Sequence, residues 1–472
     1  DKEKIFLLME GRQPIKSPND KNTYKIITLD NKIEVLLISS PDADKAAASL
    51  SVEVGQLDDP VDYQGMAHYL EHMLFLGTEK YPSDGEYDAY LTKNAGYNNA
   101  YTSETFTNYY FECSNDAFEG ALDRFAQFFR KPLFTAECTD RELNAVNSEN
   151  EMYSVNDMWR EYMLQRSMGL KNTTYWQFGI GSLKSLKKPE IRDNLIKFYE
   201  SHYSSNLMRI AIQSKHDLET LEKWTVEKFS DIQNKEKEIL RHKIVPFDKT
   251  NLSKFIRIVP IKDKDYLTFQ WLIPDTLKYY KSNPLAYLTQ LLGHEGPNSL
   301  FSMLKVEGLA VELTASPSEE MRMFSFLEVK IRLTKKGLSE WERVVNCVFV
   351  YLNILKERGV QQWFFEEIKK VKHLHFQFKE KEEPMDYVSG LTPKMVSYPH
   401  EDLLRFNYLM EEYDEELFKK ITNSLTLENL RLTLTSKDIA KDCDKTEQWY
   451  ETKYSYEDLP SWIHEAYKSP KF

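Results

Sequence analysis

The sequence predicts an α/β (α+β) fold of two homologous domains, each a mixed β-sheet packed with flanking helices. The length of 472 residues is about three times that of one domain, so two or three domains are expected. Strand-like and helical periods alternate along the chain. A segment near residue 206 also resembles one near residue 429, which indicates an internal repeat.

The chain opens with strand-like segments. Residues 23–38 hold two β-rich runs around the polar turn at residues 30–32, and residues 46–55 alternate apolar and polar positions. The period becomes helical over residues 64–76 and ends at Gly77, a residue type that readily takes the left-handed conformation after a helix. We therefore expect an N-terminal sheet followed by a helix.

More helices and a strand-like segment follow. A helix is expected over residues 84–95, a strand rich in aromatic residues over 98–113, and an amphipathic helix over 118–129 before Pro132. A single long helix is expected from about Thr139 to Met168.

The repeat indicates a duplicated domain. SNLMRIAIQSK at residues 205–215 resembles ENLRLTLTSKD at 428–438, and Asn206 and Asn429 are 223 residues apart. Residues 86–96 and 299–308 show a weaker similarity, since both are helical patterns that end at glycine. Because the stretch 232–253 is polar, we expect domains at 1–240 and 241–472. The alternative is that such short similarities arise by chance.

Charge, hydropathy and cysteine content make some partners and compartments less favoured than others. The net charge of −12 does not favour nucleic acid or an anionic membrane as a partner, and no apolar run is long enough to span a bilayer. The four cysteines form no C-x-x-C pair, which favours a reducing compartment. We expect a cytoplasmic protein, although the first residue is Asp1 and a targeting peptide could have been removed.

The helix at residues 64–76 carries the pattern H-x-x-E-H, with His68, Glu71 and His72 on one face. Two imidazoles four residues apart can bind one Zn²⁺, and the carboxylate between them can reach a water on that metal. Chance predicts roughly 0.02 such patterns in a chain of this length. The alternative is a surface helix that happens to carry these residues.

A catalytic zinc requires a third protein ligand. Glu149 lies 77 residues after His72 on the expected long helix, and Glu142, seven residues earlier, shares its face. One of them could bind the metal while the other orients a ligand imidazole. The spacing alone does not choose among Glu142, Glu149 and Glu151, and a solvated acidic face is the simpler alternative.

The segments GMAHYLEHMLFLGTEKYPSDGEYDAYLTKNAGYNNAYTSETFTNYYFE, RELNAVNSENE and NDMWR resemble the pitrilysin (insulinase) family of zinc metallopeptidases. The similarity extends over most of the chain, and it implies one half of a clam-shaped peptidase. It also implies one Zn²⁺ per chain, bound by His68, His72 and Glu149, with Glu71 as the general base and Glu142 supporting the site.

The same resemblance implies residues that contact substrate. Asn99, Ala100 and Tyr101 match edge-strand residues that hold the substrate backbone near the scissile bond. Phe75 and Trp159 match residues that shape the pocket just past it. The domain at 241–472 has no H-x-x-E-H pattern and is expected to be non-catalytic.

The implied function is a zinc metalloendopeptidase that hydrolyses unfolded peptides and small polypeptides, in which Glu71 activates a zinc-bound water. Members of the family have two such halves, so we expect the C-terminal half in the same polypeptide or in a partner subunit, and a homodimer is a further option. The alternatives are a non-catalytic or half-active peptide-binding subunit, as in mitochondrial processing peptidase partners, and a presequence peptidase. Such degenerate partners usually lose motif residues, whereas His68, Glu71, His72 and Glu149 are all present here.

Overall fold

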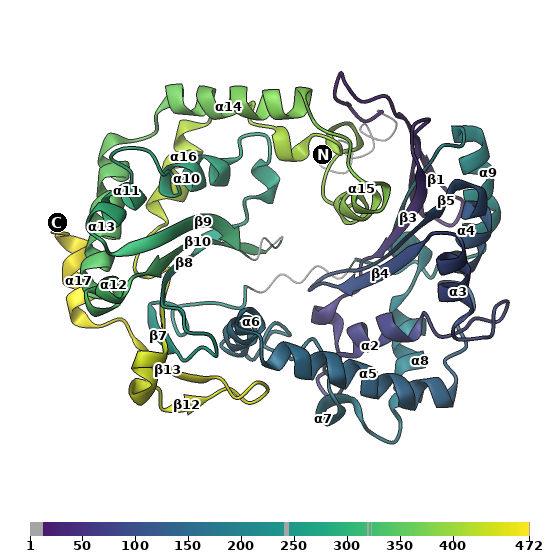
Figure 1. Ribbon diagram of the computed structural model, residues 1–472, viewed down its shortest axis with the longest axis horizontal. Helices are drawn as coiled ribbons and strands as arrows, with labels where there is room; N and C mark the ends of the chain where they lie inside the picture. Colours follow the sequence, from purple (N-terminus) through teal and green to yellow (C-terminus); the bar gives the residue numbers. More distant parts are fainter. Residues whose placement is uncertain (1–12, 240–244, 319–320, 322, 472) are drawn as a thin grey trace. The chain divides into compact units, whose positions relative to one another are not determined.

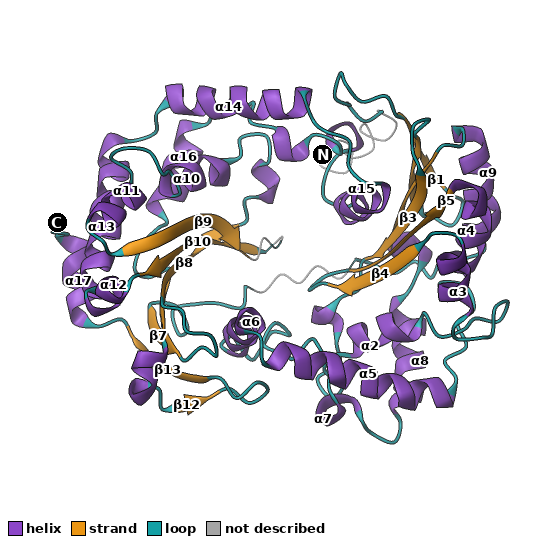
Figure 2. Ribbon diagram, in the orientation of Figure 1, coloured by secondary structure: helices purple, strands orange, loops and turns teal. Residues whose placement is uncertain are grey.

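The computed structural model describes residues 13–239, 245–318, 321 and 323–471. The chain forms two compact units, shown in Figure 1 and, by secondary structure, in Figure 2. The first unit comprises Asp1–Glu151, Gln177–Arg241 and His375–Phe406, and the second comprises Met152–Trp176, His242–Leu374 and Asn407–Phe472. The domains expected at 1–240 and 241–472 divide the linear chain, whereas each compact unit also takes a segment from the other side of that division. The expected boundary itself lies outside the described residues.

The first unit contains a six-stranded mixed sheet with the order β1-β2-β6-β3-β5-β4. Its strands are β1 (Thr23–Thr28), β2 (Glu34–Ser39), β3 (Lys45–Val52), β4 (Tyr97–Thr102), β5 (Thr107–Ser114) and β6 (Met208–Ser214). Strands β2 and β6 pair in parallel, and the other pairs are antiparallel. The predicted α/β class with mixed sheets is therefore confirmed.

Helices cover both faces of this sheet. Along β2, Val35 and Leu37 face the larger core, whereas Leu36 and Ile38 belong to a second apolar cluster on the other face, which includes residues of α15 (Pro384–Leu391), a helix from far along the chain. Because both faces are covered, β2 is apolar at successive positions. The other helices of the unit are α2 (Met66–Met73), α3 (Glu86–Lys93), α4 (Phe118–Gln127), most of α5 (Ala136–Ser154), α7 (Leu183–Leu186), α8 (Ile191–His202) and α9 (Leu218–Phe229).

The second unit contains a seven-stranded mixed sheet with the order β12-β13-β7-β11-β8-β10-β9. Its strands are β7 (Lys254–Ile258), β8 (Tyr266–Pro274), β9 (Ala310–Ser318), β10 (Phe324–Leu333), β11 (Leu430–Thr435), β12 (Lys445–Thr446) and β13 (Lys453–Asp458). Its helices are α6 (Asp157–Ser167), α10 (Pro284–Leu292), α11 (Leu300–Val306), α12 (Lys335–Ser339), α13 (Trp341–Arg358), most of α14 (Gln362–Gln377), α16 (Glu415–Asn423) and α17 (Ser461–Lys468).

The two sheets share the order of five strands, as the internal repeat predicts: β2-β6-β3-β5-β4 in the first sheet corresponds to β7-β11-β8-β10-β9 in the second. Strand β6, from the first copy of the repeat, lies between the parallel β2 and the antiparallel β3. Strand β11, from the second copy, lies between the parallel β7 and the antiparallel β8. The helices α3 and α11 each precede an edge strand, β4 and β9, so the weaker similarity also reflects equivalent positions.

Two predicted elements are corrected. The single helix expected from Thr139 to Met168 is two helices, because α5 ends at Ser154 and Asn156 caps α6 by accepting a hydrogen bond from the Met158 N–H. The strand expected over residues 98–113 is a hairpin of β4 and β5. No helix within the described residues is long and apolar enough to span a membrane.

Candidate metal centre and peptidase site

The helix α2, which carries the H-x-x-E-H residues, begins at Gly65 in the left-handed conformation, with φ of 95°. The Asp59 carboxylate accepts hydrogen bonds of 2.7 Å from the N–H groups of Gly65 and Ala67. A negative charge at this position stabilises the positive end of the helix dipole. The loop before the helix thus determines where its first turn lies.

Each motif imidazole is oriented by a hydrogen bond at Nδ1. His68 Nδ1 lies 2.6 Å from the carbonyl oxygen of Ile180, and His72 Nδ1 lies 2.8 Å from Glu142 Oε1. An Nδ1–H that donates to these oxygens leaves the Nε2 lone pair available as a ligand. The two Nε2 atoms are 3.3 Å apart.

Glu149 completes a three-residue cluster with the two histidines. Its Oε2 lies 3.2 Å from His72 Nε2 and 3.6 Å from His68 Nε2. Donors about 2.0–2.1 Å from a tetrahedral zinc are about 3.3 Å from one another. The donor types and their spacing therefore fit Zn²⁺, and within the described residues this is the one such group of His, Cys, Asp or Glu.

The long helix α5 delivers the acidic residues to this cluster (Figure 1). The Tyr69 hydroxyl donates a hydrogen bond of 2.7 Å to the Thr139 carbonyl and so ties α2 to α5. Glu142 and Glu149, two turns apart, both face α2. Glu151 accepts a hydrogen bond from Asn147 on the exposed part of the helix instead. The packing of the two helices thus places Glu149, and not Glu151, beside the two histidines.

Burial and charge set the protonation of the site. Burial raises the pKa of Glu71, which is only 6% exposed, although His68 and His72 oppose this effect. Burial alone would lower the pKa of His72, but the hydrogen bonds that its ring donates to Glu142 and Glu149 outweigh this effect and raise the pKa to about 10. The carboxylates therefore create a negative field that favours a cation at the Nε2 atoms.

Strand β4 carries the residues expected to contact substrate. Among the described residues β4 pairs only with β5, so its other edge is unpaired. The N–H of Ala100 points away from β5 and donates to the Asn99 side chain at 2.9 Å. Tyr101 is exposed and packs against the rings of Phe106 and Tyr110.

The two remaining predicted residues lie in different units. Phe75 is partly buried among Tyr87, Tyr109 and Phe128 in the core of the first unit. Trp159 lies on α6 in the second unit and stacks on Tyr153, with 4.2 Å between ring centroids.

Three models of one peptidase family match successive parts of the chain. The model described as "Insulinase (Peptidase family M16)" matches residues 34–172, "Peptidase M16 inactive domain" matches 190–372, and "Middle or third domain of peptidase_M16" matches 376–472. The chain belongs to the M16 insulinase family. Its predicted membership of the pitrilysin (insulinase) family is thus confirmed, and M16 proteins are zinc metallopeptidases that degrade peptides.

Individual M16 relatives agree with this assignment. Insulin-degrading enzyme of Homo sapiens is 41% identical over 456 residues, which are 95% of this chain and 45% of the relative. The A-factor-processing enzyme of Saccharomyces cerevisiae is 38% identical over 97% of this chain and 45% of the relative. The chain therefore spans about half the length of the relatives it matches.

Solved M16 structures share the fold. The crystal structure of pitrilysin matches with a TM-score of 0.93 and 30% identity over 98% of this chain and 49% of pitrilysin. A protease from Helicobacter pylori matches with a TM-score of 0.72 over 88% of this chain and 99% of its own; at 17% identity it shows the fold alone.

Sequence reasoning missed three groups at the site of this M16 chain: the Asp59 carboxylate, the Ile180 carbonyl and the Thr102 hydroxyl, which donates a hydrogen bond to Glu71. Asp59 and Ile180 lie in loops, and each makes its contact through a backbone group of one of the two partners. No periodic sequence pattern predicts such contacts. Thr102 could have been found, because it continues the alternation of the strand that begins at Tyr97.

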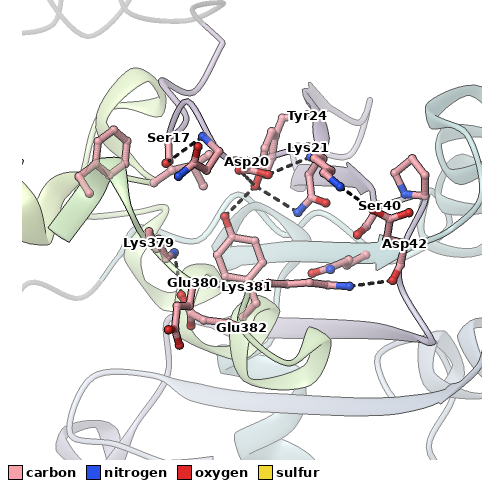
Figure 3. Close-up of a pocket in the computed structure, with 17 residues that line it drawn as sticks. Ser17, Asp20, Lys21, Tyr24, Ser40, Asp42, Lys379, Glu380, Lys381 and Glu382 are labelled. Carbon is pink, nitrogen blue, oxygen red and sulfur yellow. Dashed lines mark hydrogen bonds and ion pairs between the residues drawn. The ribbon is translucent and has the colours of Figure 1, made fainter. Parts of the chain in front are cut away.

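A separate cavity of about 260 Å³ lies in the first unit, between residues near the N-terminus and residues 376–387 (Figure 3). The hydroxyls of Tyr24 and Tyr387 lie 2.8 Å apart, and Lys381 donates to the Asp42 carbonyl at 2.7 Å. The lining includes none of His68, His72 and Glu149, so this cavity is not part of the candidate metal centre.

Proposed function

We propose that this chain is the catalytic half of a zinc metalloendopeptidase that hydrolyses unfolded peptides and small polypeptides. The observation that carries the proposal is the convergence of His68 Nε2, His72 Nε2 and Glu149 Oε2 within 3.2–3.6 Å of one another. Two imidazoles and one carboxylate are the ligand set of a catalytic zinc site that keeps a position open.

The residues around the metal have different roles in the reaction. Bound zinc supplies a Lewis acid that makes water a nucleophile near neutral pH. Glu71 accepts a proton from the attacking water and then passes it to the leaving amine. Glu142 holds the His72 imidazole in the orientation and tautomer that present Nε2.

The unpaired edge of β4 supplies the substrate-binding surface. An extended peptide pairs with Asn99, Ala100 and Tyr101 as an added strand, which recognises backbone more than side chains. Folded proteins offer few such free strands, so the enzyme selects unfolded peptides.

The relatives are about twice as long as this chain, which supports a second half of the peptidase beyond the one described here. We expect it to donate groups that stabilise the tetrahedral intermediate, whether it lies in the same polypeptide or in a partner subunit. A non-catalytic peptide-binding subunit is the weaker alternative, because the complete motif and its supporting carboxylate are both present.

The first test is zinc content per purified chain. We expect about one zinc in the unmodified protein, a large loss in Glu149→Gln, and no loss in Glu151→Gln, the matched control on the same helix. Little zinc in the unmodified chain, or equal loss in both variants, would contradict the proposed ligand set.

The second test is peptide cleavage by Glu71→Gln. The variant is expected to retain zinc and lose cleavage by a factor of about 10² or more. A near-normal rate would remove Glu71 from its role as the base.

A further inference from the structure

Thr102 is the last residue of the edge strand β4, and its side chain reaches Glu71. The Thr102 hydroxyl donates a hydrogen bond of 2.6 Å to Glu71 Oε2. The alternation of β4 explains the contact, because its even-numbered residues are partly buried and its odd-numbered residues are exposed. One strand thus offers a free edge to solvent and a hydroxyl to the helix that carries the base.

The neighbouring hydroxyl does not compete for this hydrogen bond. Thr107, the register partner of Thr102 on β5, lies 3.4 Å from it between the two Oγ1 atoms. A threonine hydroxyl has one hydrogen, and that of Thr107 has a closer acceptor in the Val54 carbonyl at 2.8 Å. Glu71 Oε2, at 2.6 Å, is also a much nearer acceptor for the Thr102 hydrogen than the Thr107 hydroxyl oxygen at 3.4 Å.

The contact fixes one of the two carboxylate oxygens of Glu71. The terminal torsion of a glutamate is otherwise broad. Among the described residues, Glu71 Oε1 has no hydrogen-bond partner, so this oxygen stays available for a proton. The side chain is buried, with 6% of its surface exposed.

We propose that Thr102 is a positioning residue that orients the Glu71 carboxylate for proton transfer and couples that orientation to the edge strand. This inference rests on the proposed function, since it assumes that Glu71 acts as the base. A peptide that pairs with β4 contacts the same strand whose last residue, Thr102, holds the carboxylate of Glu71. Substrate register and base orientation are then set by one element.

The test compares Thr102→Val, which removes the hydroxyl at constant shape, with Thr102→Ser, which keeps it. Thr28→Val is the matched control, because Thr28 is the last residue of β1, the opposite edge strand of the same sheet. Zinc content and thermal melting of each full-length, zinc-loaded variant establish that the site and the fold are intact.

With a quenched fluorogenic peptide, Thr102→Val is expected to lower kcat by about 10- to 100-fold and to change KM by less than about twofold. Thr102→Ser is expected to restore most of the loss, and Thr28→Val to leave both constants unchanged. A loss that Ser does not rescue, or one that falls mainly on KM, would overturn the proposal, because it would indicate a structural or substrate-binding role.

A second measurement does not require turnover. A peptide hydroxamate offers hydrogen-bond donors to the base, so its affinity for the zinc-loaded chain is expected to fall about tenfold in Thr102→Val. In the Glu71→Gln background the same substitution is expected to change nothing. An equal effect in both backgrounds would show that Thr102 does not act through Glu71.

The two measurements separate the two proposals. If the zinc-loaded wild-type chain neither cleaves the peptide nor binds the hydroxamate, the proposed function fails and the inference about Thr102 fails with it. If the wild type does either and Thr102→Val equals it, only the inference about Thr102 is overturned.

Discussion

Glu142 Oε1 lies 2.8 Å from His72 Nδ1, on the side of the imidazole opposite to the atom that faces Glu149. The imidazole thus bridges two carboxylates that lie two turns apart on one helix. Glu142 contacts the ring at Nδ1 and Glu149 contacts it at Nε2, so we expect the two acidic residues to affect metal binding differently.

Removal of the orienting carboxylate should weaken zinc binding without abolishing it. We expect Glu142→Gln to reduce zinc affinity by about 10- to 100-fold, as is usual for groups that orient metal ligands, and Glu149→Gln to reduce it further. Competition with a chromophoric chelator measures both affinities. Equal affinities of Glu142→Gln and wild type would contradict this role of Glu142.

The close approach of two glycines should make Gly65 essential to the site. A Cβ at Gly65 would lie 2.3 Å from the Cα of Gly181, next to the carbonyl that orients His68, and φ at Gly65 is 95°. Gly65→Ala should therefore destabilise the protein by roughly 1–3 kcal/mol or more and lower its zinc affinity. Chemical denaturation and zinc titration measure the two effects.

Gly390 is the matched control. It lies exposed on α15, and a Cβ there would meet nothing within 4 Å. Gly390→Ala is expected to stabilise the protein by about 0.5–1 kcal/mol and to leave zinc affinity unchanged. If both glycine variants lose stability equally, the contact between Gly65 and Gly181 is not the cause.

Acid stability should depend on Glu34 in the first sheet. Burial opposes ionisation, but a hydrogen bond from His400 and the charge of Arg209 outweigh it and hold the pKa of Glu34 below its ordinary value of 4.5. Because the folded-state pKa is the lower one, this stabilisation is complete above about pH 5 and is lost as pH falls through the folded-state pKa.

The measurement is the free energy of unfolding against pH for wild type and Glu34→Gln. The wild type is expected to lose stability more steeply below about pH 5 than the variant. Parallel curves through this range would show that Glu34 is not responsible.

Binding of an extended peptide should depend on its backbone N–H groups. The Ala100 N–H faces the unpaired edge of β4. A peptide added as a strand at that edge would form backbone hydrogen bonds with β4, some of them donated by the peptide's own N–H groups. In the inactive Glu71→Gln variant, N-methylation of one peptide amide that pairs with β4 should weaken binding by about 2- to 10-fold. Methylation at alternate amides, which point away from β4, should have little effect. Equal losses at both positions would contradict strand addition.

The sequence by itself determined the local elements and their chemistry. The spacing of His68, Glu71 and His72 requires one helical face, because 3.6 residues make a turn. The period-2 patterns located the strands, and the internal repeat indicated two sheets of related topology. These features depend on residues close together in the chain, or on similarity between two segments of it, so they can be read without coordinates.

Only the tertiary structure decided which groups meet across the chain. Glu149 is selected over Glu151 by the packing of α5 against α2, and the Ile180 carbonyl reaches His68 because Gly65 and Gly181 allow two loops to touch. The break at Asn156 and the packing of α15 on a sheet formed by early segments were likewise not predictable, since both depend on long-range contacts rather than local propensity. Local periodicity specifies the face of an element, and close packing specifies its neighbour.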